Sequence, residues 1–168
     1  AKARVKGIEA EVVALPADNV TLRGTLGYQK GEYKSYNTPL PAAYDLASAP
    51  LDRTPKWTWA LDATYTLPLA NSSALSFNAN VSFVDKNLYT QSITAESSNT
   101  YLNARTLLNA SVTFTGPAEH YFVRVFGRNL TDKKYLNADL VVATLFAWSQ
   151  YGPPRYYGAE AGFNFGGR

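Results

Sequence analysis

The stretch from Arg155 to Phe165 alternates apolar and polar residues with a period of two. One face of such a stretch carries Tyr157, Ala159, Ala161, Phe163 and Phe165, and the other carries Gly158, Glu160, Gly162 and Asn164. A period of two is that of a β-strand whose two faces meet different surroundings. The apolar face has aromatic residues at both ends, and a strand of about 9–11 residues can cross a membrane at a tilt. The stretch therefore predicts a transmembrane β-strand.

The same alternation recurs along the chain and predicts an all-β, antiparallel transmembrane fold. Seven long strands are expected, at residues 3–15, 19–36, 56–68, 74–89, 100–115, 119–135 and 154–165. The strand at 119–135 alternates less regularly, because Phe122 and Phe126 fall on the face of Arg124 and Arg128. A further short strand is possible at 140–146. Short turns alternate with long connections, which is the asymmetry of bacterial outer-membrane barrels.

Four motifs lie on or beside these strands. They are the closing strand from Arg155 to Phe165 behind a Pro-Pro pair, Gly-Arg-Asn-Leu-Thr-Asp-Lys-Lys-Tyr at 127–135, Pro-Lys-Trp-Thr at 55–58, and Gly-Ile-Glu-Ala-Glu at 7–11. Together they resemble the barrel of TonB-dependent outer-membrane receptors, and the resemblance covers nearly the whole chain. One departure is the tail Gly166-Gly167-Arg168, because the family normally ends at the terminal Phe.

The resemblance implies that residues 1–168 are the C-terminal segment of a larger barrel, about seven strands of its wall, in the bacterial outer membrane. The family's plug domain has no counterpart in the chain. The implied function is TonB-dependent uptake of a siderophore, cobalamin, saccharide or similar small ligand. The implied partners are outer-membrane lipid, the rest of the barrel with its plug, TonB acting through the plug, and the barrel-assembly machinery, which would recognise Phe165.

In this interpretation the apolar faces meet lipid and the polar faces line a wet lumen. Aromatic residues near strand ends, such as Trp57, Tyr65 and Phe83, would form girdles at the membrane interfaces. The polar faces carry asparagines, such as Asn78 and Asn80, in numbers that a small dry core could not satisfy. The charged residues expected to face the lumen are Arg23, Asp62, Arg105, Arg124 and Glu160.

The long connections carry aromatic residues that are candidates for ligand contact. They are Tyr33, Tyr36, Tyr44, Phe146, Trp148 and Tyr151. Aromatic rings stack on sugars and aromatic ligands, but they also pack loops against each other. The pattern leaves both interpretations open.

Composition and motifs argue against an enzyme. The chain has no Cys, which rules out a disulfide framework and a zinc finger. Its single histidine, His120, lies beside Glu119 in an expected turn, without a second histidine for a metal site or a serine partner. The net charge of +3 is too small to indicate nucleic-acid binding, and no apolar run is long enough for a membrane helix. We expect no catalytic residue, metal or cofactor.

The strand count predicts that the chain is incomplete. In a meander of seven strands the first and last run in the same direction and cannot close an antiparallel barrel, and single-chain bacterial barrels have even strand numbers. The lack of Met and of a signal segment favours the same interpretation. A transmembrane strand at 140–146 would raise the count to eight and allow closure. Two alternatives are a free-standing small outer-membrane barrel with a structural or adhesive role, and a soluble lipocalin-like barrel with the apolar face inside.

Overall fold

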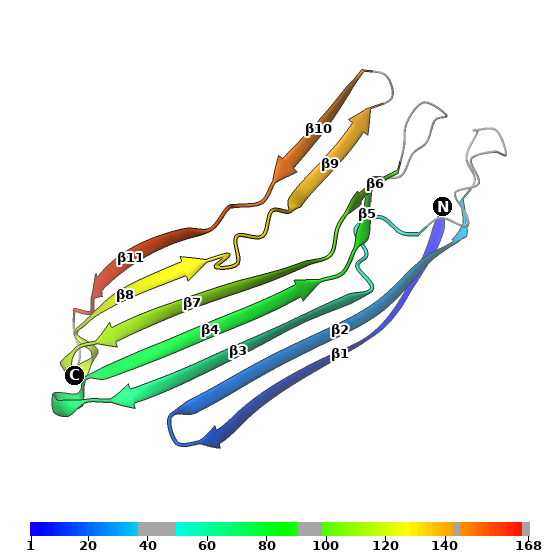
Figure 1. Ribbon diagram of the computed structural model, residues 1–168. Coiled ribbons are helices and arrows are strands. Elements are labelled where there is room, and N and C mark those ends of the chain that lie inside the picture. The colour runs from blue at the N-terminus through cyan, green and yellow to red at the C-terminus, as the bar shows by residue number, and fades with distance from the viewer. Residues whose placement is uncertain (37–49, 91–98, 143–144, 166–168) are drawn as a thin grey trace.

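The computed structural model describes residues 1–36, 50–90, 99–142 and 145–165. Seven of its strands form one antiparallel sheet in the order β1-β2-β3-β4-β7-β8-β11 (Figure 1). Their bounds are β1 (Lys2–Ala17), β2 (Val20–Ser35), β3 (Trp57–Pro68), β4 (Ala74–Val84), β7 (Arg105–Thr115), β8 (Tyr121–Arg128) and β11 (Tyr156–Phe163). The predicted all-β antiparallel fold with seven long strands is confirmed.

Two separate hairpins extend beyond this sheet. One joins β5 (Asn87–Thr90) to β6 (Thr100–Leu102), and the other joins β9 (Leu136–Val142) to β10 (Phe146–Tyr151). The predicted strand at 140–146 therefore falls on the end of β9 and the first residue of β10, in a hairpin outside the seven-stranded sheet. The predicted strand at 119–135 is too long, because Asn129 and Asp132 adopt left-handed backbone angles, with φ of 48° and 52°.

The two ends of the sheet differ in their connections. At one end the strands are joined by a two-residue turn at Asp18-Asn19 and by the short 3-10 helices η3 (Ala70–Ser72) and η4 (Pro117–Glu119). At the other end lie the long connection between β2 and β3 and the two hairpins (Figure 1). The predicted asymmetry between short turns and long connections is present. We call these the turn end and the loop end.

Cross-strand register sorts the side chains onto two faces, because directly opposite residues point to the same side of a sheet. One face pairs Trp59 with Phe83, Ala63 with Ala79, and Val125 with Ala159. The other face pairs Arg23 with Asp62, Asn80 with Asn109, and Arg124 with Glu160. We call the first the apolar face and the second the polar face.

Aromatic rings on the apolar face gather at two levels. At the loop end the ring centroids of Tyr28 and Trp57 lie 4.6 Å apart, and those of Trp59 and Phe83 lie 5.7 Å apart. At the turn end the pairs are Tyr65 with Phe77 at 6.4 Å, Phe114 with Tyr121 at 6.1 Å and Tyr121 with Phe163 at 6.4 Å. Smaller side chains, including Ala63, Ala79 and Ala110, fill the middle. This is the arrangement of two interfacial girdles around an apolar band.

Little of this sheet is buried. The buried apolar residues of the described chain are Leu88, Leu102 and Ala138, and all three belong to the hairpins at the loop end. On the apolar face, by contrast, Leu61 is 47% exposed and Val125 is 53% exposed. Among the described residues, no helix has the length and hydrophobicity that crossing a membrane requires. The sheet is open, with β1 at one edge and β11 at the other, and these two strands run in the same direction.

Candidate functional site

The register places all five charged residues predicted for the lumen on the polar face. Arg23 lies opposite Asp62, and Arg105 lies opposite Val84 with its guanidinium carbon 5.2 Å from the Tyr135 ring centroid. Arg124 lies opposite Glu160, and its Nη1 atom is 3.1 Å from the Glu160 Oε1 atom. The polar face thus carries charges of both signs on several strands. That this face lines a lumen remains a prediction.

A ladder of hydrogen bonds links the centre of the polar face across strands. The Nδ2 atom of Asn78 lies 3.1 and 3.0 Å from the two carboxylate oxygens of Asp62 and 2.9 Å from Thr64 Oγ1. The Asn109 amide donates to Asn80 Oδ1 at 3.4 Å. Because an amide nitrogen carries only two hydrogens, the Asn78 contacts are alternatives within one polar cluster. These side-chain hydrogen bonds join β3 to β4 and β4 to β7 across the polar face.

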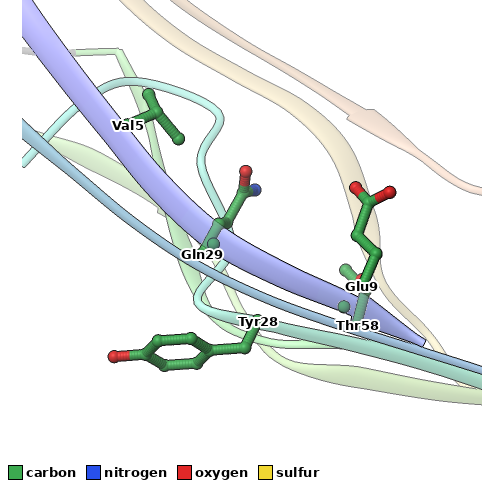
Figure 2. Close-up of a pocket in the computed structure, with 7 residues that line it drawn as sticks. Val5, Glu9, Tyr28, Gln29 and Thr58 are labelled. Carbon is green, nitrogen blue, oxygen red and sulfur yellow. The ribbon is translucent and has the colours of Figure 1, made fainter.

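A hollow of about 440 Å³ opens on the polar face near the loop end of β1 to β3. In Figure 2 the side chains of Val5, Glu9 and Gln29 point to one side of the sheet, and the Tyr28 ring points to the other. Gly7 and Gly27 also line the hollow, and a Cβ atom at Gly27 would lie 2.7 Å from Thr58 Oγ1. At Gly7 and Gly27 the place of a Cβ atom is therefore already taken by atoms of the neighbouring strands. With the Glu9 carboxylate and the Gln29 amide at its wall, the hollow can receive a polar group.

Two phenylalanines of β8 cover two glycines of β11. Phe126 lies opposite Gly158 and Phe122 lies opposite Gly162, on the polar face. A Cβ atom at Gly158 would approach the Phe126 ring to 2.5 Å, and one at Gly162 would collide with the Phe122 ring. This packing explains the poor alternation noted in the sequence, because each ring lies over a residue that has no side chain. The signal in the sequence was that the two phenylalanines and the two glycines are each four residues apart.

Replacing one of these glycines should cost stability only while the ring is present. We expect Gly158→Ala to destabilise the protein by about 1–3 kcal/mol through overpacking against Phe126, and the added Phe126→Ala change to remove most of that penalty. The coupling between the two substitutions is measured by a double-mutant cycle, with urea unfolding of the intact protein in lipid vesicles. Gly24→Ala is the matched control, because its Cβ atom would meet Leu61 at an ordinary 3.9 Å. If the effects of Gly158→Ala and Phe126→Ala on stability were simply additive, the Phe126 ring would not be packed against Gly158 as described.

The Asn-Leu-Thr-Asp motif forms a buried anchor for the closing strand. Asn129 is 4% exposed, and its Nδ2 atom donates to the carbonyl oxygens of Lys133 at 3.0 Å and Pro153 at 3.1 Å. Its Oδ1 atom accepts from the Lys133 backbone N–H at 2.9 Å. The Asp132 carboxylate accepts from the Arg155 backbone N–H at 3.2 Å. The motif therefore ties the end of β8 to the segment that leads into β11.

The predicted ligand-contacting aromatics do not form one site in the described residues. Tyr33 and Tyr36 pack edge to face with ring centroids 5.0 Å apart. Phe146, Trp148 and Tyr151 lie on β10 and are 55%, 48% and 69% exposed. No ring contact joins these two groups within the part of the chain that the structure describes, and Tyr44 lies outside it. Their role in ligand binding remains a prediction.

The connections at the loop end contact one another through the hairpins. The Thr100 hydroxyl donates to the Asp139 carbonyl, which links β6 to β9, and the Arg53 backbone N–H donates to the Leu88 carbonyl at 2.7 Å. Burial raises the pKa of the Asp52 carboxyl above its ordinary value, and neighbouring Arg53 partly opposes this. Hydrogen bonds thus join the described segments of the loop end to one another. Sequence reasoning missed this arrangement, because its apolar residues sit in strands too short to show a period.

The turn end holds the remaining predicted residues. His120 follows η4; its backbone N–H donates to the Pro117 carbonyl at 3.1 Å and its carbonyl accepts from Asn164 at 2.8 Å. Phe165 lies just beyond, 95% exposed. No group of three metal-binding side chains occurs within the described residues. The turn end thus combines backbone hydrogen bonds around η4 with an exposed aromatic side chain.

Comparison with known proteins gives a family for this architecture. The sequence model of the family described as TonB dependent receptor-like, beta-barrel matches residues 1–130. No curated protein matches the chain. Among solved structures, the ferric yersiniabactin uptake receptor FyuA from Yersinia pestis aligns with a TM-score of 0.78 at 16% identity, over 97% of this chain and 24% of that one.

Two receptors of Acinetobacter baumannii align similarly. The ferric preacinetobactin receptor BauA gives a TM-score of 0.68 at 24% identity, over 95% of this chain and 22% of that one. The siderophore receptor PiuA gives a TM-score of 0.72 at 16% identity, over 95% of this chain and 21% of that one. The chain therefore spans less than a quarter of the length of each of these receptors, and at such identities the likeness shows the fold. Because the family model covers most of the chain and the two-faced sheet agrees with it, this protein belongs to the TonB-dependent receptor-like β-barrel family of the bacterial outer membrane.

Proposed function

We propose that residues 1–168 form the C-terminal part of the barrel wall of an outer-membrane receptor for active uptake of a small ligand. The observation that carries this proposal is the open, two-faced sheet of a family that builds transmembrane barrels. Unpaired strand edges are not tolerated in lipid. Further strands of a larger barrel would therefore pair with β1 and β11, and a plug inside that barrel would contact TonB.

The two faces have separate roles in this proposal. The apolar face contacts lipid, which accounts for large exposed side chains such as Leu61 and Val125 that water would disfavour as one continuous patch. The polar face lines the lumen, where Arg23, Asp62, Arg105, Arg124 and Glu160 stay hydrated. The free-standing barrel and the lipocalin-like barrel would both need a closed sheet, so the receptor is the better fit.

Ferric siderophores are the first ligand class to test. The three aligned proteins are receptors for ferric yersiniabactin, for ferric preacinetobactin and for a siderophore. Cobalamin and saccharides are the next classes. The exposed aromatics of β10 and the Tyr33–Tyr36 pair at the loop end are the proposed first contacts, because flat rings bind aromatic and sugar groups.

Uptake in cells tests the function directly. A strain that lacks the gene for the intact protein would be complemented with it and supplied with radiolabelled ferric siderophores, cobalamin and oligosaccharides in turn. We expect accumulation of one class, and loss of that accumulation when TonB is deleted or the proton gradient is collapsed. Accumulation that is indifferent to TonB would favour a passive barrel.

Phe165 is proposed as the contact for the barrel-assembly machinery. Its ring is 95% exposed at the turn end, whereas Phe163 is in ring contact with Tyr121. We expect Phe165→Ala to reduce the amount of intact protein assembled in the outer membrane several-fold, and more than Phe163→Ala does. Heat-modifiable mobility of the barrel in membrane fractions reports assembly. Normal assembly of the Phe165 variant would remove this residue from the proposal.

A further inference from the structure

Two lysines stand directly opposite each other where the apolar face ends at the loop end. Along β1 and β2 the register pairs Ile8 with Tyr28 and then, one step further out on the same face, Lys6 with Lys30. Like charges directly opposite on neighbouring strands are destabilising. A pair that sits beside an apolar band therefore calls for a neutralising partner.

A third lysine and two aromatic rings complete this corner. The Nζ atom of Lys56 lies 5.9 Å from the Tyr28 ring centroid, and the Tyr28 and Trp57 rings are 4.6 Å apart. Tyr28 and Trp57 belong to the girdle at the loop end, so the three cations lie at and just beyond the level where lipid headgroups begin. We call Lys6, Lys30 and Lys56 the lysine cluster; all three residues are exposed.

Within the described residues, no ion pair joins a carboxylate to a lysine of the lysine cluster. The nearest acidic residue along β2, Glu32, is 2.6 Å from Lys34 Nζ, and its carboxylate also attracts Lys30 and Arg4, so one negative charge is shared among three cations. The other ion pair of the described chain is Arg124 with Glu160, on the polar face.

We propose that the lysine cluster binds the phosphorylated headgroup of a lipid in the membrane leaflet nearest the loop end. The phosphate oxygens would accept hydrogen bonds from the lysine ammonium groups, and the acyl chains would lie along Ile8, Tyr28 and the apolar face below. A lipid fits better than a soluble anion, because Lys6 and Lys30 share a face with the apolar band. The inference rests on the proposed function, in which that face contacts lipid.

Lipid retention by the intact protein tests the site. The protein, purified in detergent, would be mixed with dioleoyl phosphatidic acid or with dioleoylglycerol, which has the same chains without the phosphate, and bound lipid would be counted by native mass spectrometry. We expect the Lys30→Gln/Lys56→Gln variant to bind phosphatidic acid about tenfold more weakly than the unaltered protein. The control is Lys133→Gln/Lys134→Gln, which removes the same charge from the exposed turn after β8 and should change binding little.

Each outcome decides a different point. Equal phosphatidic acid binding by the two double variants, or equal retention of dioleoylglycerol, would overturn the headgroup site. Displacement of phosphatidic acid by glycerol phosphate at a similar concentration would also overturn it, since the cluster would then take a soluble anion. A sheet that retains neither lipid in any variant would contradict the membrane placement itself, and so the proposed function.

Discussion

Ala79→Arg should destabilise the folded barrel by about 2–4 kcal/mol, the cost of a cation on the lipid face at mid-membrane. Ala79 lies between Ala63 and Ala110 on the apolar face, two residues from Phe77 of the turn-end level and four residues from Phe83 of the loop-end level. Asn80→Arg should be tolerated, because Asn80 lies on the polar face opposite Asp62 and Asn109. The two positions are neighbours on one strand, so only the face differs.

Unfolding in urea from phospholipid vesicles measures the difference between these variants. Ala79→Leu is the control for side-chain size, and it should leave stability nearly unchanged, since lipid accommodates a longer apolar side chain. Equal destabilisation by the two arginine variants would show that both faces meet the same surroundings. Greater destabilisation by Asn80→Arg than by Ala79→Arg would place the polar face in lipid, and the proposed assignment of the two faces would then be wrong.

The sheet could be predicted from the sequence because its two faces lie in unlike surroundings. On β4, Leu75, Phe77, Ala79, Val81 and Phe83 alternate with polar residues along the whole strand, so both the strand and its faces can be recognised. The charged residues of the polar face followed from the same period. The period of two does not indicate which face meets lipid. That assignment is inferred from the aromatic girdles and from the family.

The connections at the loop end could not be predicted in the same way. In β9, Ala138 is buried while its neighbours on either side are partly or fully exposed, and β5 has only four residues. Such short strands do not show a period. The end of β8 was missed for another reason: Asn129 turns the chain through a left-handed conformation, which alternation of the surrounding residues does not reveal.

Two features of the polar face depend on residues without side chains. At Gly7 and Gly27, which line the hollow beside Glu9, neighbouring strands occupy the place of a Cβ atom, and at Gly158 and Gly162 the rings of β8 do so. A glycine in a strand often marks close approach of another group. The sequence therefore held the signal, but the approaching group is identified only once the strand register is known.

Asn129→Ala should destabilise the protein by about 1–3 kcal/mol, because it removes the three hydrogen bonds that the buried Asn129 side chain makes to the backbone of Lys133 and Pro153. The exposed residue Asn137 supplies the control, and Asn137→Ala should have little effect. The measurement is again urea unfolding in vesicles, combined with hydrogen exchange at the Arg155 amide. That amide is held by Asp132 in the same turn, so its exchange should accelerate when the turn is lost.

Asn129→Gly separates the two contributions that the asparagine makes. The φ angle of 48° is one that glycine adopts freely and alanine adopts at a cost of roughly 1 kcal/mol. If the hydrogen bonds to Lys133 and Pro153 anchor the closing strand, Asn129→Gly should recover only this backbone contribution of the stability lost in Asn129→Ala. The Arg155 amide should still exchange faster than in the unaltered protein. Full recovery by glycine would mean that the motif serves only to turn the chain. Position 129 would then carry no anchoring role, and β11 would be held by its strand pairing with β8 alone.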